Sequence, residues 1–164
     1  MPFFSIEAKG FDELRRSMEK LPEKAADVAA LALYEGAGVM ADAVSQAVEG
    51  IATKRLKYPA PEGKQRMPSP EEKAILQNAK HGVARFKKNL DGVSTSVGFQ
   101  NSGYAELNGR TVPVPVIANA INSGTSFMKK QPFLRRAFSQ NKRAAEAAID
   151  AGIKAREHML EPDT

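Results

Sequence analysis

Apolar side chains recur at helical spacing along much of the chain. One short amphipathic helix is predicted over 11–21, because apolar residues recur there at steps of three, four and three: Phe11, Leu14, Met18 and Leu21. A long helix is predicted from Pro22 to about Ala52, with an apolar face made of Val28, Leu31, Leu33, Met40, Val44, Val48 and Ile51. A last helix is predicted from Pro132 to about Leu160. It should carry toward the core Leu134, Phe138, Ala145, Ile149, Gly152 and Ile153.

Shorter alternating stretches predict strands between these helices. Residues 3–8 and 93–99 alternate apolar with small or polar side chains, and 83–88 forms a shorter candidate strand. Asp91 and Gly92 are predicted as the hairpin turn between 83–88 and 93–99, which would make these two strands antiparallel. Residues 101–111 are rich in glycine and polar side chains and are interpreted as a loop. Residues 112–121 contain two prolines, and their apolar spacing favours a helical turn.

Residues 53–69 have a different composition. They contain three prolines and five basic residues with almost no apolar periodicity, which predicts an extended basic loop. Immediately after it, Ser69 and Glu72 have the spacing of a capping box that would start a short helix ending near Lys80.

These elements predict an α+β fold in one domain. A small, mostly antiparallel sheet would pack against the long helix in the N-terminal half and the long C-terminal helix. We expect a single domain over 1–160, with the 53–69 loop inside it and 161–164 as a C-terminal tail.

Two features of the long helix have alternative interpretations. Gly36 and Gly38 each lower helix stability by about 1 kcal/mol, so they predict close packing, either of an ordinary core helix or of a helix between the sheet and a neighbouring subunit. Glu35, Asp42 and Glu49 repeat every seven residues and are interpreted as a solvated stripe.

Composition narrows the environment of the protein. The 164 residues include no cysteine, which excludes disulfides and thiolate metal sites. The apolar residues form no continuous run of the roughly 18 to 20 needed to cross a bilayer, and the N-terminus lacks a secretion signal pattern. We therefore expect a soluble intracellular product with no membrane partner.

Positive charge is concentrated in the middle of the chain. The formal charge is −4 over 1–52, +7 over 53–90 and +2 over 91–164. Such a block can hold DNA nonspecifically or an acidic protein surface, and it is equally explained as a solvated lysine-rich loop. The candidate contacts in the predicted loop are Lys54, Arg55, Lys57, Lys64 and Arg66.

Groups that could converge on catalysis are scarce. His81 and His158 lie far apart and lack the neighbouring ligands of a metal site. The chain has no phosphate-binding glycine loop, dinucleotide fingerprint or nucleophile elbow. We expect no enzyme activity, with no catalytic residues, no cofactor and no metal.

Residues 122–138 contain the most informative segment. Gly124 suits a turn with positive φ, and Pro132 suits the start of a helix. Four apolar residues would dock this helix on the core: Phe133, Leu134, Ala137 and Phe138. Its basic start, with Arg135 and Arg136, opposes the helix dipole, which indicates either acidic groups on another subunit or a tolerated penalty.

The same segment resembles the neck and tail-completion proteins of long-tailed bacteriophages, the gene-product-ten-like family. That family has a Gly-Thr turn, a variable stretch and then Pro-Phe-hydrophobic-Arg-x-Ala, matched here by Gly124, Thr125, Pro132, Phe133, Leu134, Arg135 and Ala137. Residues 4–14 are similar to its opening strand, glycine and helix, and residues 97–104 to its central strand. Many members have a glutamate before the Gly-Thr turn, where this chain has Asn122 and Ser123.

The resemblance implies a virion structural protein at the head–tail junction, made in the bacterial host cytoplasm. It implies an oligomeric ring, hexameric in such families, that completes or terminates the tail. Its partners would be the connector or stopper and the tail-tube or tail-terminator proteins, with nonspecific contact to packaged DNA. The subunit or partner interface would comprise Gly124, Thr125, Lys129, Lys130, Pro132, Phe133, Arg135 and Arg136. The alternatives are a stand-alone nonspecific nucleic-acid-binding module and a regulatory adaptor.

Overall fold

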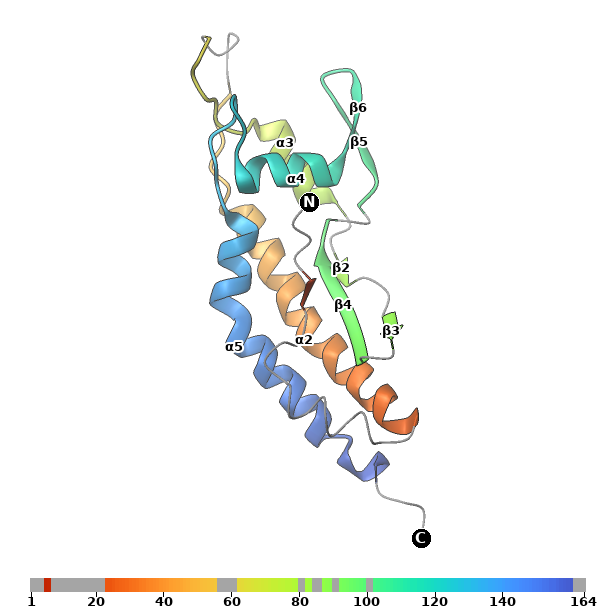
Figure 1. Ribbon diagram of the computed structural model, residues 1–164. Coiled ribbons are helices and arrows are strands. Elements are labelled where there is room, and N and C mark those ends of the chain that lie inside the picture. The colour runs from red at the N-terminus through yellow and green to blue at the C-terminus, as the bar shows by residue number, and fades with distance from the viewer. Residues whose placement is uncertain are drawn as a thin grey trace. The chain divides into compact units, whose positions relative to one another are not determined.

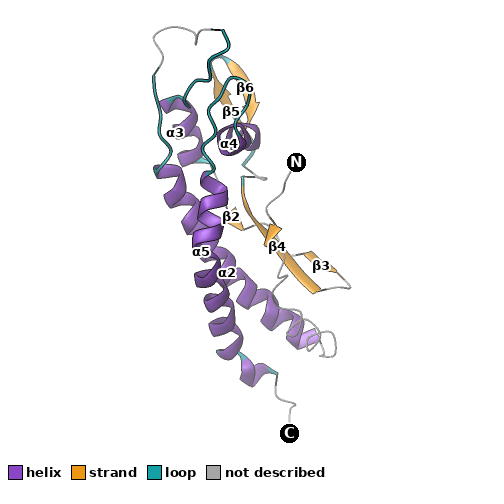
Figure 2. Cartoon of the chain, turned by 60° about the vertical axis from the view of Figure 1, so that its left-hand side comes forward, coloured by secondary structure: helices purple, strands orange, loops and turns teal. Residues whose placement is uncertain are grey.

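The computed structural model describes residues 5–6, 23–55, 62–79, 82–83, 87–89, 92–99 and 102–160. These residues form an α+β fold, which confirms the predicted class (Figure 1). Figure 2 shows its helices in purple and its strands in orange. The helices are α2 (Glu23–Glu49), α3 (Pro70–Asn78), α4 (Val114–Ser123), α5 (Phe133–Lys154) and the 3-10 helix η1 (Glu157–Met159). The strands are β1 (Ser5–Ile6), β2 (Gly82–Val83), β3 (Lys87–Asn89), β4 (Gly92–Gly98), β5 (Tyr104–Leu107) and β6 (Arg110–Pro113). The helix predicted over 11–21 lies outside the described residues.

The chain divides into two compact units, each assembled from separate segments. Unit 1 comprises residues 1–41, 83–97 and 141–164, and unit 2 comprises residues 42–82 and 98–140. The boundary falls within α2 and within α5, so each long helix contributes to both units. The two units are considered separately below.

The sheet of unit 1 is built around β4. Strand β1 pairs with it antiparallel, with Ser5 opposite Ser96, and the strand order is β1-β4-β2. Strand β3 also pairs antiparallel with β4, with Asn89 opposite Gly92. The predicted antiparallel pairing is confirmed, but Gly92 belongs to strand β4 and not to the turn in which it was predicted. Asp91 lies outside the described residues. Thr95 and Val97 are buried, as the alternating pattern predicted for one face.

Two glycines let α2 and α5 approach closely in unit 1. A Cβ on Gly36 would collide with the side chain of Ile149, and a Cβ on Gly152 would lie 3.0 Å from Cα of Ala32. The close packing predicted from the glycines is thus correct for Gly36. Gly38 has no such contact within the described chain, because nothing lies within 4 Å of the Cβ that it lacks. Packing of Gly38 against a neighbouring subunit stays a prediction.

One residue that the sequence assigned to the buried face of α2 is exposed. Leu31 is 46% exposed although it was assigned to the core face, because Val28 and Ala32, four residues apart, occupy that face. Among the described residues, 25–49 would be long and apolar enough to cross a membrane by length and composition alone. Core helices of soluble proteins meet the same test, so this property decides nothing about a membrane.

The C-terminal end of α5 differs from the prediction. The α-helix ends at Lys154, about six residues before the predicted end. Arg156 then donates a hydrogen bond from Nη1 to the carbonyl of Gly152 at 2.8 Å and from Nη2 to Glu35 Oε1 at 2.7 Å. A cation thus sits at the negative end of the helix dipole, where it is stabilising. The basic start of α5 still opposes the dipole.

Unit 2 contains a hairpin that the sequence analysis assigned to a loop. Strands β5 and β6 pair antiparallel, with Leu107 opposite Arg110. The intervening residues Asn108 and Gly109 have φ of 52° and 72°, the left-handed values of a tight two-residue hairpin turn. The Asn-Gly pair was the available signal, and the glycine-rich composition around it was given too much weight.

Helices α3 and α4 pack together below this hairpin, which leads directly into α4 (Figure 1). The predicted capping box at the start of α3 is confirmed: Glu72 N donates to Ser69 Oγ at 3.1 Å, and Ser69 N donates to Glu72 Oε2 at 2.8 Å. The helical turn predicted within 112–121 is confirmed as α4. The buried apolar side chains include Leu76, Val114, Ile117, Ile121 and Met128.

Candidate assembly interface

Gly124 ends α4 in a turn that only glycine accommodates well. Its φ is +75°, and its amide donates to the carbonyl of Ala120 at 2.9 Å. A Cβ at this position would lie 2.9 Å from Cβ of Lys130 and 3.1 Å from its backbone. Both the backbone conformation and the lack of space therefore require glycine, as the sequence predicted from the turn.

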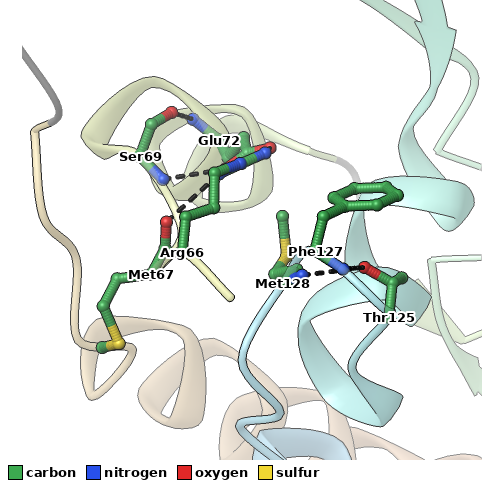
Figure 3. Close-up of polar contacts among 7 residues, drawn as sticks. All are labelled: Arg66, Met67, Ser69, Glu72, Thr125, Phe127 and Met128. Carbon is green, nitrogen blue, oxygen red and sulfur yellow. Dashed lines mark hydrogen bonds and ion pairs between the residues drawn. The ribbon is translucent and has the colours of Figure 1, made fainter. Parts of the chain in front are cut away.

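The hydroxyl of Thr125 closes the loop that follows. Thr125 Oγ1 accepts hydrogen bonds from Met128 N at 2.9 Å and from Phe127 N at 3.3 Å (Figure 3). Thr125 N also donates to the carbonyl of Met128 at 3.0 Å. The loop is fixed on its inner side because Met128 is only 2% exposed, whereas Phe127 is 59% exposed.

The predicted basic loop lies next to this turn. Arg66 N donates to the carbonyl of Phe127 at 2.8 Å, and Lys129 N donates to the carbonyl of Arg66 at 2.9 Å, forming an isolated parallel bridge between Arg66 and Met128. Gln65 Nε2 adds a hydrogen bond to the carbonyl of Thr125 at 2.7 Å. Two groups of candidate residues that are far apart in sequence therefore form one local structure.

The guanidinium of Arg66 forms an ion pair with the carboxylate of Glu72. Its Nη1 and Nη2 donate to the two carboxylate oxygens of Glu72 at 2.8 and 2.6 Å, and Nη1 also donates to the carbonyl of Met67 at 3.1 Å (Figure 3). The Glu72 side chain is 5% exposed and that of Arg66 is 26% exposed. This paired charge makes Arg66 a poor candidate for contact with DNA or an acidic partner.

The ion pair changes the titration of both groups. Burial by itself raises the pKa of Glu72, but the hydrogen bonds from the Arg66 side chain and the Ser69 amide outweigh burial and lower that pKa below its usual value. The hydrogen bond to Glu72 raises the pKa of Arg66, against the opposing effect of burial. Both groups therefore stay charged at neutral pH. One buried carboxylate both caps α3 and holds the basic loop.

The other cations of the predicted loop are exposed. Arg55 lies 3.4 Å from Glu71 in an ion pair in which both side chains are more than half exposed, so the pair contributes little stability. Lys54 and Lys64 are exposed and form no ion pair within the described part of the chain. Lys57 lies outside the described residues.

The start of α5 is capped from α4. Asn122, which is 6% exposed, accepts a hydrogen bond from Leu134 N at its Oδ1, at 3.1 Å. Pro132 immediately precedes the helix, and its carbonyl accepts from Arg136 N at 3.0 Å. Pro132 has no side-chain acceptor of its own, so Asn122 supplies the cap. The position at which the chain differs from the resembled family thus has a structural role.

Two further contacts fix the segment that precedes α5. The side-chain amide of Gln131 exchanges two hydrogen bonds with the backbone of Ala52, accepting at 2.9 Å and donating at 2.8 Å. Phe133 is buried and meets Phe99 edge to face, with ring centroids 6.2 Å apart. The ring contact and the paired amide both hold the segment in place.

The outer side of the same segment is charged and exposed. The exposed candidates are Lys129, Lys130, Arg135 and Arg136. Within the described residues none of these four forms an ion pair. We use the name turn segment for residues 122–136, which have a fixed inner side and a cationic outer side.

Three important residues of the turn segment were not predicted from the sequence. Asn122 and Met128 are buried inside the segment, and Phe127 is exposed on it. The signal for Asn122 was a polar residue at the end of an apolar helix. For Met128 and Phe127, a short apolar pair inside a polar stretch carried no periodicity that could separate the buried side chain from the exposed one.

Within the described residues, no group of three or more His, Asp or Glu side chains is placed to bind a metal ion. His158 is exposed on η1, and His81 lies outside the described residues.

Comparison of the chain with known proteins found no matching family model, no matching curated protein and no matching solved structure.

Proposed function

We propose that this protein is a structural component of a long-tailed phage virion at the head–tail junction. In this role it forms an oligomeric ring that completes or terminates the tail and helps join it to the head connector. The proposal rests on the sequence resemblance to the neck and tail-completion family, which extends over the residues of the turn segment.

One observation carries the proposal: the turn segment is rigid inside and cationic outside. Gly124 and Thr125 fix the turn, while Asn122 and Phe133 fix the start of α5. Such an arrangement suits an interface, because a surface that is already ordered loses little conformational entropy on assembly. The exposed cations would meet acidic groups of another subunit or of the connector.

The number of subunits and their neighbours belong to the same proposal. A sixfold ring follows from the resemblance, and its neighbours would be the connector or stopper and the tail tube or tail terminator. The protein would reside in the virion after synthesis in the host cytoplasm. No part of this role requires catalysis or a cofactor.

The direct test is to delete the coding sequence from the phage and to examine lysates by electron microscopy. Free heads and free tails in place of joined particles are expected, and the complete chain supplied in trans should restore joining. Joined, infectious particles in the absence of the protein would end the proposal. A double substitution at Lys129 and Lys130 to glutamate should fail to complement although the protein accumulates normally.

A stand-alone nucleic-acid-binding module is the second candidate, favoured by the charge of unit 2. This unit contains 12 basic and 6 acidic side chains, a formal charge of +6. Fluorescence anisotropy with labelled duplex DNA separates the two functions. The module requires tight binding by the isolated monomer that weakens steeply with salt, whereas a neck protein requires none.

A further inference from the structure

Phe127 is an exposed aromatic residue on a fixed backbone. Its carbonyl accepts a hydrogen bond from Arg66 N at 2.8 Å, and its amide donates to Thr125 Oγ1 at 3.3 Å (Figure 3). Nevertheless 59% of the residue is exposed. Aromatic side chains usually bury their large apolar area, in a core or in an interface. The hydrogen bonds hold this residue where the ring stays in water.

The local backbone decides which side chains share the outer side of the turn segment. Successive side chains of an extended chain point to opposite sides, and Arg66 and Met128 face each other across the parallel bridge. Met128 is buried and the side chain of Arg66 is mostly covered, so these two lie on the inner side. Phe127 and Lys129, one position to either side of Met128, are both exposed on the outer side.

The surroundings of Phe127 are cationic. Lys130 follows Lys129, and Lys64 lies on the neighbouring segment, two residues before Arg66; all three lysines are exposed and form no ion pair within the described part of the chain. Residues 122–136 are all described, and Phe127 is the only large apolar side chain exposed among them. The outer side of the turn segment is therefore one fixed aromatic ring with lysines near it.

We propose that Phe127 is the anchor by which the turn segment binds a different protein of the head–tail junction, in an apolar pocket bordered by carboxylates. A few buried aromatic anchors supply most of the binding energy of an interface, while charges at the rim steer association and fix orientation. The lysines would meet the carboxylates at the rim. This inference rests on the proposed neck role and states the chemistry of the surface that the protein would bind.

Charge complementarity selects a different protein over a second copy of this chain. Unit 2 has a formal charge of +6, so two copies meeting through their turn segments would repel each other. Unit 1 of a second copy has a formal charge of only −1 and offers little attraction. An acidic surface on another protein satisfies both the ring and the lysines.

Two other classes of partner explain only part of the surface. Duplex DNA attracts lysines through its phosphates, but it accepts an aromatic ring only where a base step is opened at a cost in stacking energy. A membrane surface binds in proportion to the apolar area that enters it, and the turn segment offers one ring. Binding to DNA and binding to a membrane are therefore outcomes of the test that would replace the inference.

Joining in vitro measures the contribution of the ring. Free heads and free tails from lysates of the deletion phage are mixed with increasing amounts of purified protein, and infectious particles are counted. Phe127→Ser should raise the concentration needed for half-maximal joining by about thirtyfold, and Phe127→Leu, which keeps an apolar side chain, should raise it less. Tyr104→Ser is the matched control. It removes an aromatic ring of the same unit that is 74% exposed, and it should change that concentration less than about twofold.

Melting temperatures measured by circular dichroism control for folding. Phe127 and Tyr104 are both exposed, so Phe127→Ser and Tyr104→Ser should melt close to the parent chain. The role of the lysines is read from salt dependence. Lys129→Gln should weaken joining by about threefold at low salt and make it less sensitive to added salt, whereas Phe127→Ser should keep the salt sensitivity of the parent chain.

Photochemical cross-linking identifies the partner. Phe127 is replaced by the photoreactive analogue p-azidophenylalanine in the chain supplied in trans, and the joined particles are purified and irradiated. Mass spectrometry should find the cross-link on another virion protein, at a site with apolar side chains and neighbouring Asp or Glu residues. A cross-link to a second copy of this chain or to DNA would assign the ring to that partner and contradict the inference.

Further outcomes would also contradict it. Phe127→Ser that joins heads to tails at the concentration of the parent chain would show that the ring is no anchor. Loss of self-association in that variant, measured by analytical ultracentrifugation, would place the pocket on a second copy. With joining unchanged, loss of binding to labelled duplex DNA would favour phosphate recognition. Loss of binding to vesicles of phosphatidylcholine and phosphatidylglycerol would favour a membrane.

These results are separable from those on the proposed function. If joining requires the protein but Phe127→Ser joins as well as the parent chain, the neck role stands and only the anchor fails. If heads and tails join in the absence of the protein, the neck role itself fails, and the assignment of the partner fails with it.

Discussion

The two units of this protein differ in the interactions that stabilise each of them internally. In unit 1, α2 and α5 meet through small residues, where Gly36 accommodates Ile149 and Gly152 accommodates Ala32. Unit 2 depends on specific hydrogen bonds. Its side chains close the ends of helices and loops, as Lys73 does when its Nζ donates to the carbonyls of Glu49 at 2.6 Å and Ile51 at 3.1 Å. The helix contact of unit 1 therefore relies on small residues, with the Arg156–Glu35 pair beside it, whereas the turns and helix ends of unit 2 rely on paired polar groups.

Charge separates the two units as well. Unit 1 has 12 basic and 13 acidic side chains, a formal charge of −1, whereas unit 2 carries +6. Arg66 and Lys73, which each make a hydrogen bond of 2.6 Å, stabilise the fold of unit 2. The cations of the turn segment remain exposed. This difference in charge agrees with the proposal that the turn segment of unit 2 contacts a partner.

The largest effect is expected from the Arg66–Glu72 pair. Arg66→Met leaves a carboxylate buried without its counter-charge and should lower the free energy of unfolding by about 3 kcal/mol. Urea denaturation followed by circular dichroism measures the loss. Arg55→Met, at the exposed pair with Glu71, is the matched control and should cost less than about 1 kcal/mol. Equal losses in the two variants would remove the distinction between a structural and a surface arginine.

The packing of unit 1 is tested at its glycines. Gly36→Ala forces a Cβ against Ile149 and against the carbonyl oxygen of Ala145, which would lie 2.9 Å away, and should destabilise by about 2 kcal/mol. Gly38→Ala is the control in the same helix. It meets nothing within 4 Å and should stabilise the monomer by about 0.5 to 1 kcal/mol through better helix propensity.

Gly36→Ala in unit 1 and Arg66→Met in unit 2 together sharpen the comparison between the units. Hydrogen exchange measured by mass spectrometry should show Gly36→Ala increasing exchange mainly in 23–41 and 141–154, and Arg66→Met mainly in 62–79 and 114–136. Uniform increases in both variants would mean that the two units unfold as one.

An effect of similar size is expected at the turn. Gly124→Ala must adopt a φ of +75° and also crowd Lys130, so it should cost about 2 kcal/mol. Gly63→Ala has nearly the same φ, +77°, but open space around it, and should cost about 1 kcal/mol. Thermal melting of the two variants isolates the contribution of crowding, and identical melting temperatures would show that none exists.

The smallest effect is the pH dependence of the buried pair. The folded pKa of Glu72 is lowered, so its contribution to stability is complete above the unfolded value of about 4.3 and is lost as the pH falls through the folded pKa. Urea midpoints measured between neutral and acidic pH should decline less steeply in Glu72→Gln than in the parent chain. Parallel declines would show that Glu72 contributes nothing to acid sensitivity.

Local signals in the sequence were sufficient for several elements. The capping box at Ser69 and Glu72, the glycine turn at Gly124 and the long helix from Glu23 depend on neighbours within a few residues, and all are found in the structure. The β5–β6 hairpin had an equally local signal in Asn108 and Gly109. The prediction of a loop over 101–111 was wrong although this local signal was present.

Other features depend on residues that are distant in sequence. Nothing local distinguishes Arg66, which is paired with Glu72, from Lys64, which is exposed. The same holds for Gly36, which is packed against Ile149 more than a hundred residues away, and Gly38, which is open. The sequence by itself determined the capping box at Ser69, the turn at Gly124 and the charge of each segment, because these depend on local backbone geometry and composition. Only the tertiary structure decided which charges are compensated and which glycines are packed, because burial and ion pairing require segments that the fold brings together.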